Sequence, residues 1–192
     1  MKPLDARTRL IHAMTAALQK RGLHGSGLSE LLADAGASKG VLYHHFPGGK
    51  TELAVAAIDA TVSRLCLLLD ERMASNDPAA ALMAWINNAQ LRLAASGYEQ
   101  GCPLATIALE TTASDVEIRA ALGAGFALIR VRMAAGLVRA GFDPGTTDAL
   151  AALLLAAYEG GLLQARAAGT PEPMNLVGAA LLALLTLHRP KE

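Results

Sequence analysis

Apolar residues recur at the spacing of an α-helix along most of the chain, and capping or helix-breaking residues separate the segments. Ala and Leu, two of the strongest helix formers, dominate the composition, and runs of β-branched residues are scarce. No segment has the alternating pattern of a β-strand. We therefore predict an all-α fold of nine helices, at residues 5–21, 27–35, 38–46, 50–74, 77–96, 101–111, 116–140, 145–168 and 172–188.

Residues that cap or stop helices mark most of these boundaries. Asp5, Ser26 and Ser38 are placed to accept backbone N–H groups in the first turns of the first three helices. Asp77 precedes a proline at the first helical position of the fifth helix. Gly36 stands where the second helix should end. These residues predict the boundaries independently of the apolar spacing.

Two short helices joined by a glycine-containing turn, at residues 27–35 and 38–46, have the layout of a helix-turn-helix motif. Neighbouring residues of a helix point about 100° apart, so the second helix cannot bury all of its bulky side chains. Val41 and His45, four residues apart, lie on one side of it, and we expect Phe46 to anchor its end in the core. The remaining side chains would then be available to a partner molecule.

The exposed side of this second helix carries groups that suit DNA. Ser38 and Lys39 lie at its start, where backbone N–H groups and the helix dipole favour phosphate. Gly40 leaves room for a close approach of the backbone. Tyr43 offers a hydroxyl to phosphate and a ring edge to a base. Lys50, which begins the next helix, is a second candidate for a phosphate contact.

Two other interpretations of residues 38–46 compete with DNA binding. An exposed polar helix without a partner would show the same pattern. A metal site needs ligands that converge at spacings of three or four residues, as in HExxH. His44 and His45 are adjacent and diverge, and no Cys, Asp or Glu stands nearby at ligand spacing. We therefore expect no metal here.

Charge is distributed unevenly along the chain, although the net charge is zero. Residues 1–50 hold seven Lys and Arg against three Asp and Glu, a net charge of +4, so the rest of the chain carries −4. A basic head on an acidic body suits a polyanionic partner for the head alone. A difference of this size also occurs by chance on ordinary solvated surfaces.

Apolar runs and cysteines favour a cytoplasmic protein. The N-terminus turns polar too soon for a signal peptide. The longest apolar runs, 149–158 and 176–187, are shorter than the roughly 18–20 residues that cross a bilayer. Cys66 and Cys102 lie far apart without CxxC spacing, so we expect neither a disulfide framework nor a zinc site. Cys102, at the start of a predicted helix, leaves a redox-sensing role open.

Residues 22–53, GLHGSGLSELLADAGASKGVLYHHFPGGKTEL, resemble the DNA-binding motif of TetR-type transcriptional regulators. The usual form has a hydroxyl and a branched apolar residue where Gly27 and Leu28 stand, then a segment like IA..AGVSKGTLYHHF and a lysine that opens the fourth helix. The FPGGK form, with GCPLATIALET at 101–111 and AYEGGLLQARA at 157–167, resembles the LmrA/YxaF-like branch. The nine-helix layout suits this family along the whole chain.

The resemblance implies a homodimeric repressor with a DNA-binding domain at residues 1–50 and a ligand-binding and dimerisation domain at residues 51–192. Each subunit would place the helix at 38–46 in the major groove of an operator that is an inverted repeat. The residues that the resemblance assigns to this DNA-facing surface are Ser38, Lys39, Gly40, Leu42, Tyr43 and His44. Those that it assigns to phosphate contacts are Ser26, Lys50 and Thr51, and those that it assigns mainly to the core are Val41, His45 and Phe46.

The last two helices, at 145–168 and 172–188, are rich enough in Ala and Leu to leave apolar surface after a core has formed. In the family this pair meets its copy in a four-helix dimer interface, although burial within one chain also explains part of the pattern. The resemblance further implies a small hydrophobic effector that releases the protein from DNA. The side chains expected around its cavity, all of which also suit plain core, are Leu65, Leu69, Trp85, Asn88, Phe126, Ile129, Arg130 and Tyr158.

Two other classes of function compete with a specific regulator. A helical enzyme needs a nucleophile with a base, or a metal constellation. The chain's histidines lack carboxylate or Cys partners at useful spacing; they are His12, His24, His44, His45 and His188. We therefore expect no enzyme and no cofactor. A module that coats DNA or binds only protein would show no preference among DNA sequences.

Overall fold

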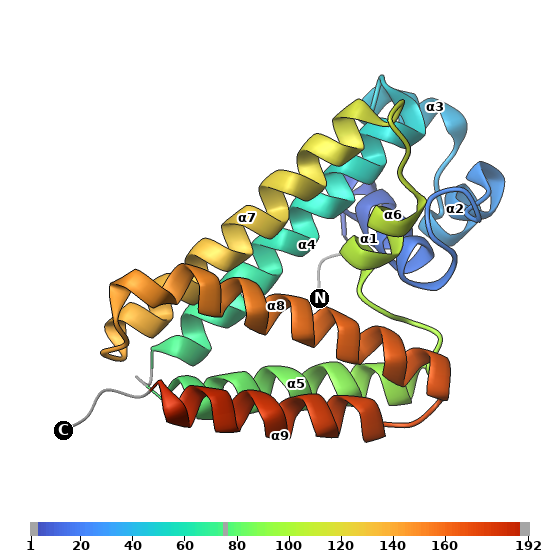
Figure 1. The fold of residues 1–192 in the computed structure, drawn as a ribbon. Helices are drawn as coiled ribbons and strands as arrows, with labels where there is room; N and C mark the ends of the chain where they lie inside the picture. Colours follow the sequence, from blue (N-terminus) through green and yellow to red (C-terminus); the bar gives the residue numbers. More distant parts are fainter. Residues whose placement is uncertain (1–3, 75–76, 189–192) are drawn as a thin grey trace. The chain divides into compact units, whose positions relative to one another are not determined.

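A computed structural model of the chain describes residues 4–74 and 77–188. Over these ranges the chain forms nine α-helices and no strand, which confirms the predicted all-α fold (Figure 1). The helices are α1 (Ala6–Arg21), α2 (Leu28–Ala35), α3 (Lys39–His45), α4 (Gly49–Met73), α5 (Pro78–Ala95), α6 (Pro103–Glu110), α7 (Val116–Arg139), α8 (Pro144–Ala168) and α9 (Glu172–Leu187).

Polar side chains cap several helices as predicted. Asp5 accepts the backbone N–H of Thr8 at 2.8 Å at the start of α1. Ser38 accepts the backbone N–H of Val41 at 3.3 Å at the start of α3. The carboxylate of Asp77 accepts two N–H groups ahead of α5, whose first residue is a proline. Each cap satisfies donors that have no partner within the helix, so these local signals decide where the helices begin.

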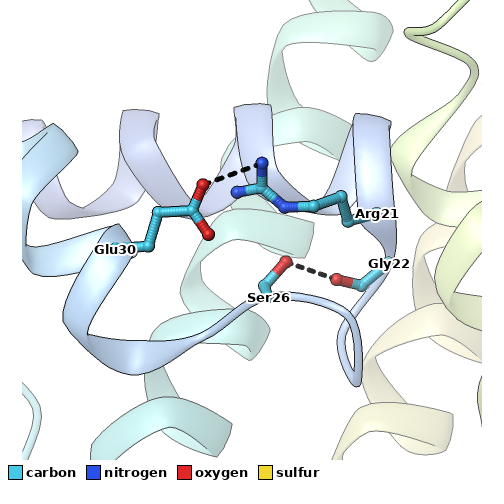
Figure 2. A network of polar contacts seen from close by, with 4 residues as sticks. All are labelled: Arg21, Gly22, Ser26 and Glu30. Carbon is cyan, nitrogen blue, oxygen red and sulfur yellow. Dashed lines mark hydrogen bonds and ion pairs between the residues drawn. The ribbon is translucent and has the colours of Figure 1, made fainter.

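Ser26 does not cap α2, contrary to the prediction. Its side chain is buried, and its hydroxyl donates back to the carbonyl oxygen of Gly22 at 2.6 Å (Figure 2). α2 begins after Gly27, which offers no side-chain cap. The hydroxyl turns inward because a buried carbonyl beyond the end of α1 needs a donor. Figure 2 also shows Arg21 of α1 in an ion pair with Glu30 of α2, at 3.1 Å between nitrogen and oxygen.

Packing divides the chain into two compact units, and the first contains the helix-turn-helix. It comprises residues up to Ser63 and Cys102–Gly125, so it holds α1 to α3, the first part of α4, all of α6 and the start of α7. α1 packs against α2, α3 and α6. The buried apolar side chains of this unit include Leu10, Met14, Leu18, Leu31, Leu42, Phe46, Leu53, Leu104 and Ile107. The core around the helix-turn-helix therefore draws on α6, far along the chain from residues 1–50.

The second unit comprises Arg64–Gly101 and the residues from Phe126 onwards. Within it α5, α8 and α9 pack against one another, and Figure 1 shows them running side by side. Glycine permits a close approach between α8 and α9. A Cβ on Gly161 would come within 2.9 Å of the sulfur of Met174 and 3.1 Å of Cγ2 of Val177. A larger residue at this position would require the Met174 or Val177 side chain to shift.

By length and composition α7 is the one helix among the described residues that is suited to crossing a bilayer. Its Met133 and Leu137 side chains are fully buried. Its Arg132 guanidinium donates to the carboxylate of Asp70 on α4 at 2.9 Å. An apolar face packed against other helices and an arginine paired with a neighbouring helix are features of a helix in a folded unit. We therefore interpret α7 as a packed helix of the protein.

Candidate nucleic-acid interface

A tight turn of three residues joins α2 to α3. Gly36 ends α2 in the left-handed conformation, at φ 58° and ψ 43°, which glycine adopts without the steric cost that a Cβ would bring. The N–H of Ala37 then donates to the carbonyl oxygen of Leu32 at 2.9 Å, which closes the end of the helix. Ser38 caps α3 at once. The predicted helix-turn-helix layout is therefore confirmed, with the predicted glycine at its turn.

Arg9 of α1 holds this turn in place, and the sequence did not single it out. Its Nε donates to the carbonyl oxygen of Ala35 at 2.9 Å, and its Nη1 donates to that of Leu4 at 2.9 Å. The Ala35 carbonyl is one of the last of α2, where a cation is favoured by the helix dipole. Arg9 thus ties α1 to the end of α2. A basic residue in the first helix has no sequence signal that would reveal this partner 26 residues away.

One side of α3 is buried and the opposite side is exposed. Leu42 and Phe46, four residues apart, are 0% and 1% exposed and belong to the core. Val41 and His45 are half-buried. The side chains on the opposite side are exposed: Ser38, Lys39, Tyr43 and His44, with Gly40 among them. α3 therefore presents a continuous polar face to solvent.

Leu42 was predicted to face DNA, and the structure contradicts this. Its side chain has no exposed surface, whereas Val41, which was predicted to be core, is only half-buried. Both residues are apolar, and their positions differ by one step of about 100° around the helix. Packing against α1 selects the Leu42 and Phe46 side. Phe46 was correctly predicted to be core.

The turn after α3 positions the ring of Tyr43. Gly49, the first residue of α4, has φ +68°, and a Cβ there would lie 3.2 Å from Cε1 of Tyr43. The ring therefore lies against a backbone that only glycine leaves clear. The carboxylate of Glu52 accepts the N–H of Gly48 at 2.7 Å and holds the same turn. Tyr43 remains 51% exposed in this position.

Two aromatic contacts involve side chains at the end of α3, one on each side of the helix. The ring of His44 meets that of His45 edge to face, with 4.9 Å between centroids. The guanidinium of Arg7 lies 5.3 Å from the ring centroid of Phe46, a cation–π distance. Across residues 4–74 and 77–188, no group of three or more His, Cys, Asp or Glu side chains is placed to hold a metal ion.

The three residues predicted to contact phosphate differ in their surroundings. Ser26 is buried, and its hydroxyl is engaged with Gly22, so this prediction is corrected: the side chain is not available to DNA. The ammonium of Lys50 donates to the carbonyl oxygen of Leu23 at 2.6 Å, which uses one of its three N–H groups. Burial lowers the pKa of Lys50, and the negative charge of Glu110 partly offsets this. Thr51 is exposed in the first turn of α4.

Several residues predicted to line a ligand cavity gather in the second unit. The rings of Trp85 and Tyr158 lie 4.6 Å apart at 31°, and both side chains are buried. Arg130 is exposed on α7, because its helix turns Ile129 and Met133 inward instead, so it does not line an interior cavity. The other predicted residues range from half-buried to buried; they are Leu65, Leu69, Asn88, Phe126 and Ile129.

α8 and α9 leave large apolar side chains on their surface. Leu153 and Leu163 of α8 are 51% and 52% exposed, and Leu176 of α9 is 66% exposed. The neighbouring residues Leu154 and Leu181 are buried within the chain. Packing of α8 on α9 therefore accounts for part of the apolar pattern of these helices but leaves another part uncovered.

Two family models match the sequence. The model described as bacterial regulatory proteins of the tetR family matches residues 10–57, which include the helix-turn-helix. The model of the C-terminal domain of LmrA/YxaF-like transcriptional regulators matches residues 78–180, more than half of the 192 residues. Together they cover most of α1, all of α2 and α3, the start of α4, and most of the chain from α5 onwards.

Sequence relatives and solved structures agree with these models. Over 182 residues the chain is 28% identical to the HTH-type transcriptional regulator YxaF of Bacillus subtilis and 26% identical to LmrA of the same organism. These matches cover 94% of this chain and 95% and 97% of those proteins. The crystal structure of a regulatory protein TetR from Rhodobacter sphaeroides is similar at TM-score 0.83 and 28% identity, over 93% of this chain and 97% of that one.

Proposed function

The chain belongs to the TetR family of bacterial transcriptional regulators, in its LmrA/YxaF-like branch, and on that premise we propose that it is a homodimeric repressor. Residues 1–50 bind DNA, and residues 51–192 bind a ligand and form the dimer. The repressor recognises an inverted-repeat operator through α3 of each subunit. A small hydrophobic ligand releases it from this operator, and the protein acts in the cytoplasm.

The exposed face of α3 is the observation that carries this proposal. Lys39 and His44 supply donors, and the Tyr43 hydroxyl and ring edge suit phosphate and base contacts. Gly40 stands between them with no side chain, which allows the helix to approach the groove closely. The buried Leu42 and Phe46 anchor the helix so that this face stays outward.

The uncovered leucines of α8 and α9 support the dimer. Leu153, Leu163 and Leu176 are each at least half exposed, and burial of such side chains against a second copy would stabilise the association. A two-fold dimer carries two copies of α3, and such a pair reads half-sites about 34 Å, or one helical turn, apart. The symmetry of the operator then follows from the symmetry of the protein.

The aromatic pair of the second unit supports a hydrophobic ligand. Trp85 and Tyr158 are in ring contact, and Leu69 and Ile129 are buried apolar residues of the same unit. Asn88, half-buried and one helical turn from Trp85, adds an amide that would orient a ligand. Sites for small molecules commonly combine apolar and aromatic walls with a few polar groups.

Selection of DNA from a random pool tests this function. Purified full-length protein is incubated with random double-stranded DNA, bound duplexes are sequenced, and the affinity of the winning sequence is measured against salt. We expect an inverted repeat that binds about a thousandfold more tightly than random DNA. Weak binding that prefers no sequence and vanishes with salt would overturn the proposal, because phosphate contacts alone behave in that way.

A further inference from the structure

We propose that Glu110, the last residue of α6, couples the position of α6 to that of the helix-turn-helix through the loop between α1 and α2. This inference rests on the proposed DNA-binding function. Glu110 lies in the segment GCPLATIALET, at 101–111, to which operator recognition assigns no role. It is 86 residues from His24, its hydrogen-bond partner in the loop.

The loop between α1 and α2 is shaped around the Glu110 carboxylate. The backbone N–H of His24 donates to Oε2 of Glu110 at 3.0 Å. Gly22 has φ +71°, and a Cβ on it would overlap the carboxylate of Glu110. The backbone conformation thus favours glycine at this position, and any side chain there would displace the Glu110 carboxylate from its place against the loop.

The same loop is held on the α4 side by Lys50. Its ammonium donates to the carbonyl oxygen of Leu23, between the two residues that meet Glu110. The charge of Glu110 also acts on Lys50 and favours its protonated form. Lys50 lies in the first turn of α4, directly after the turn that supports Tyr43. The Glu110 contact therefore acts on a loop that is linked to the DNA-facing elements on both of its sides.

The position of α6 along the chain makes it suited to carry a signal. α6 is the first helix of its unit after the chain leaves α5, which belongs to the second unit. Its Leu104 and Ile107 are fully buried, and the helix packs against α1, so it is firmly packed within the first unit. Coupling between two sites requires an element whose position both sites influence. If α6 and the helix-turn-helix are coupled in this way, operator binding also restrains α6.

Hydrogen exchange measured with and without operator tests this coupling. Full-length protein is studied with the duplex from the random-pool selection, and exchange of the amides of residues 103–110 is followed in free and bound protein. DNA-bound wild-type protein should exchange these amides about fivefold or more slowly, at the lower end of typical coupling between sites. Glu110→Met has a side chain of similar length without a hydrogen-bond acceptor. In this variant operator should no longer slow amide exchange in α6, but it should still slow amide exchange in α3.

Two further variants separate the contact from general effects on the fold. Glu110→Gln keeps an oxygen that accepts the His24 N–H, so it should restore most of the slowing in α6. Glu117→Met removes an exposed glutamate from the first turn of α7 in the same unit, so it should behave like the wild type. Circular dichroism establishes that each variant is folded, and Glu110→Ala replaces Glu110→Met if the latter is not.

The outcomes distinguish the coupling from the function on which it rests. The coupling is supported if operator slows amide exchange of α6 in wild type, fails to do so in Glu110→Met, and does so again in Glu110→Gln. Slowing that is absent in wild type, or equal in all variants, overturns the coupling while operator binding stands. A wild-type protein that selects no DNA sequence overturns the proposed function itself, and the coupling with it.

Discussion

Gly40→Ala should stabilise the protein and weaken its binding to the operator. Gly40 is the second residue of α3 and is exposed, and an added Cβ would meet only Oγ of Ser38, at 3.8 Å. Alanine is favoured over glycine in a helix interior by about 0.8–1 kcal/mol, and we expect about 0.5–1 kcal/mol this close to the N-terminus. For a chain of this size that raises the melting temperature by about 1–4 °C.

The effect on DNA binding should have the opposite sign. If Gly40 allows α3 to approach the groove closely, a methyl group at this position separates the two surfaces. A disturbance of this kind is comparable to one mismatched base pair, which costs about 1–3 kcal/mol, or roughly 5- to 150-fold in affinity. Fluorescence anisotropy with the selected duplex measures the affinity, and circular dichroism on heating measures the melting temperature.

Gly123→Ala is the matched control for this experiment. Gly123 is an exposed residue within α7, and an added Cβ would meet no atom within 4 Å. It should stabilise the protein by a similar amount and leave operator affinity unchanged. A Gly40→Ala protein that melts higher but binds DNA as tightly as wild type would refute the placement of Gly40 against DNA. A lower melting temperature would refute the stability argument.

Four further changes test other parts of the structure. Tyr43→Phe should weaken operator binding at an unchanged melting temperature, whereas Tyr98→Phe, in the second unit, should not; equal affinities would remove the Tyr43 hydroxyl from the interface. Ser26→Ala should cost about 1–2 kcal/mol of unfolding free energy through loss of its buried hydrogen bond; a reduced salt dependence of DNA binding would instead return Ser26 to the phosphate contacts. Leu176→Glu should yield a helical monomer in analytical ultracentrifugation, and a persistent dimer would place the interface elsewhere. Burial raises the pKa of the Cys66 thiol, so above a pH of about 9 this thiol ionises in the unfolded chain but stays neutral in the folded protein. The unfolding free energy of wild type should therefore fall relative to that of Cys66→Ala as pH rises through this range, and equal pH dependence of the two proteins would contradict this.

Helix boundaries were predictable from the sequence because their signals act over a single turn. Asp5 and Ser38 accept N–H groups three residues ahead, and Gly36 ends α2 through its own left-handed backbone. None of these interactions depends on a distant segment. Local signals alone do not decide the role of Ser26. Its hydroxyl could cap the first turn of α2 or donate to the buried carbonyl oxygen of Gly22, and it does the latter.

The exposed face of α3 was predicted only in part. Ser38, Lys39, Gly40, Tyr43 and His44 are exposed as the DNA-facing assignment requires. Leu42 and Val41 are both apolar neighbours in a helix of seven residues, which is too short for spacing to define the buried side. The packing of α3 against α1 made that choice and buried Leu42 completely.

The sequence alone therefore determined the all-α class, most helix ends, the helix-turn-helix and the polar residues on α3, because spacing, caps and turns are properties of neighbouring residues. Only the tertiary structure decided which side of α3 is buried, that Arg9 holds the turn, and that Glu110 fills the space above Gly22. Partners 26 and 86 residues apart meet only when the chain has folded. No local pattern encodes such a meeting, because it depends on the packing of whole helices.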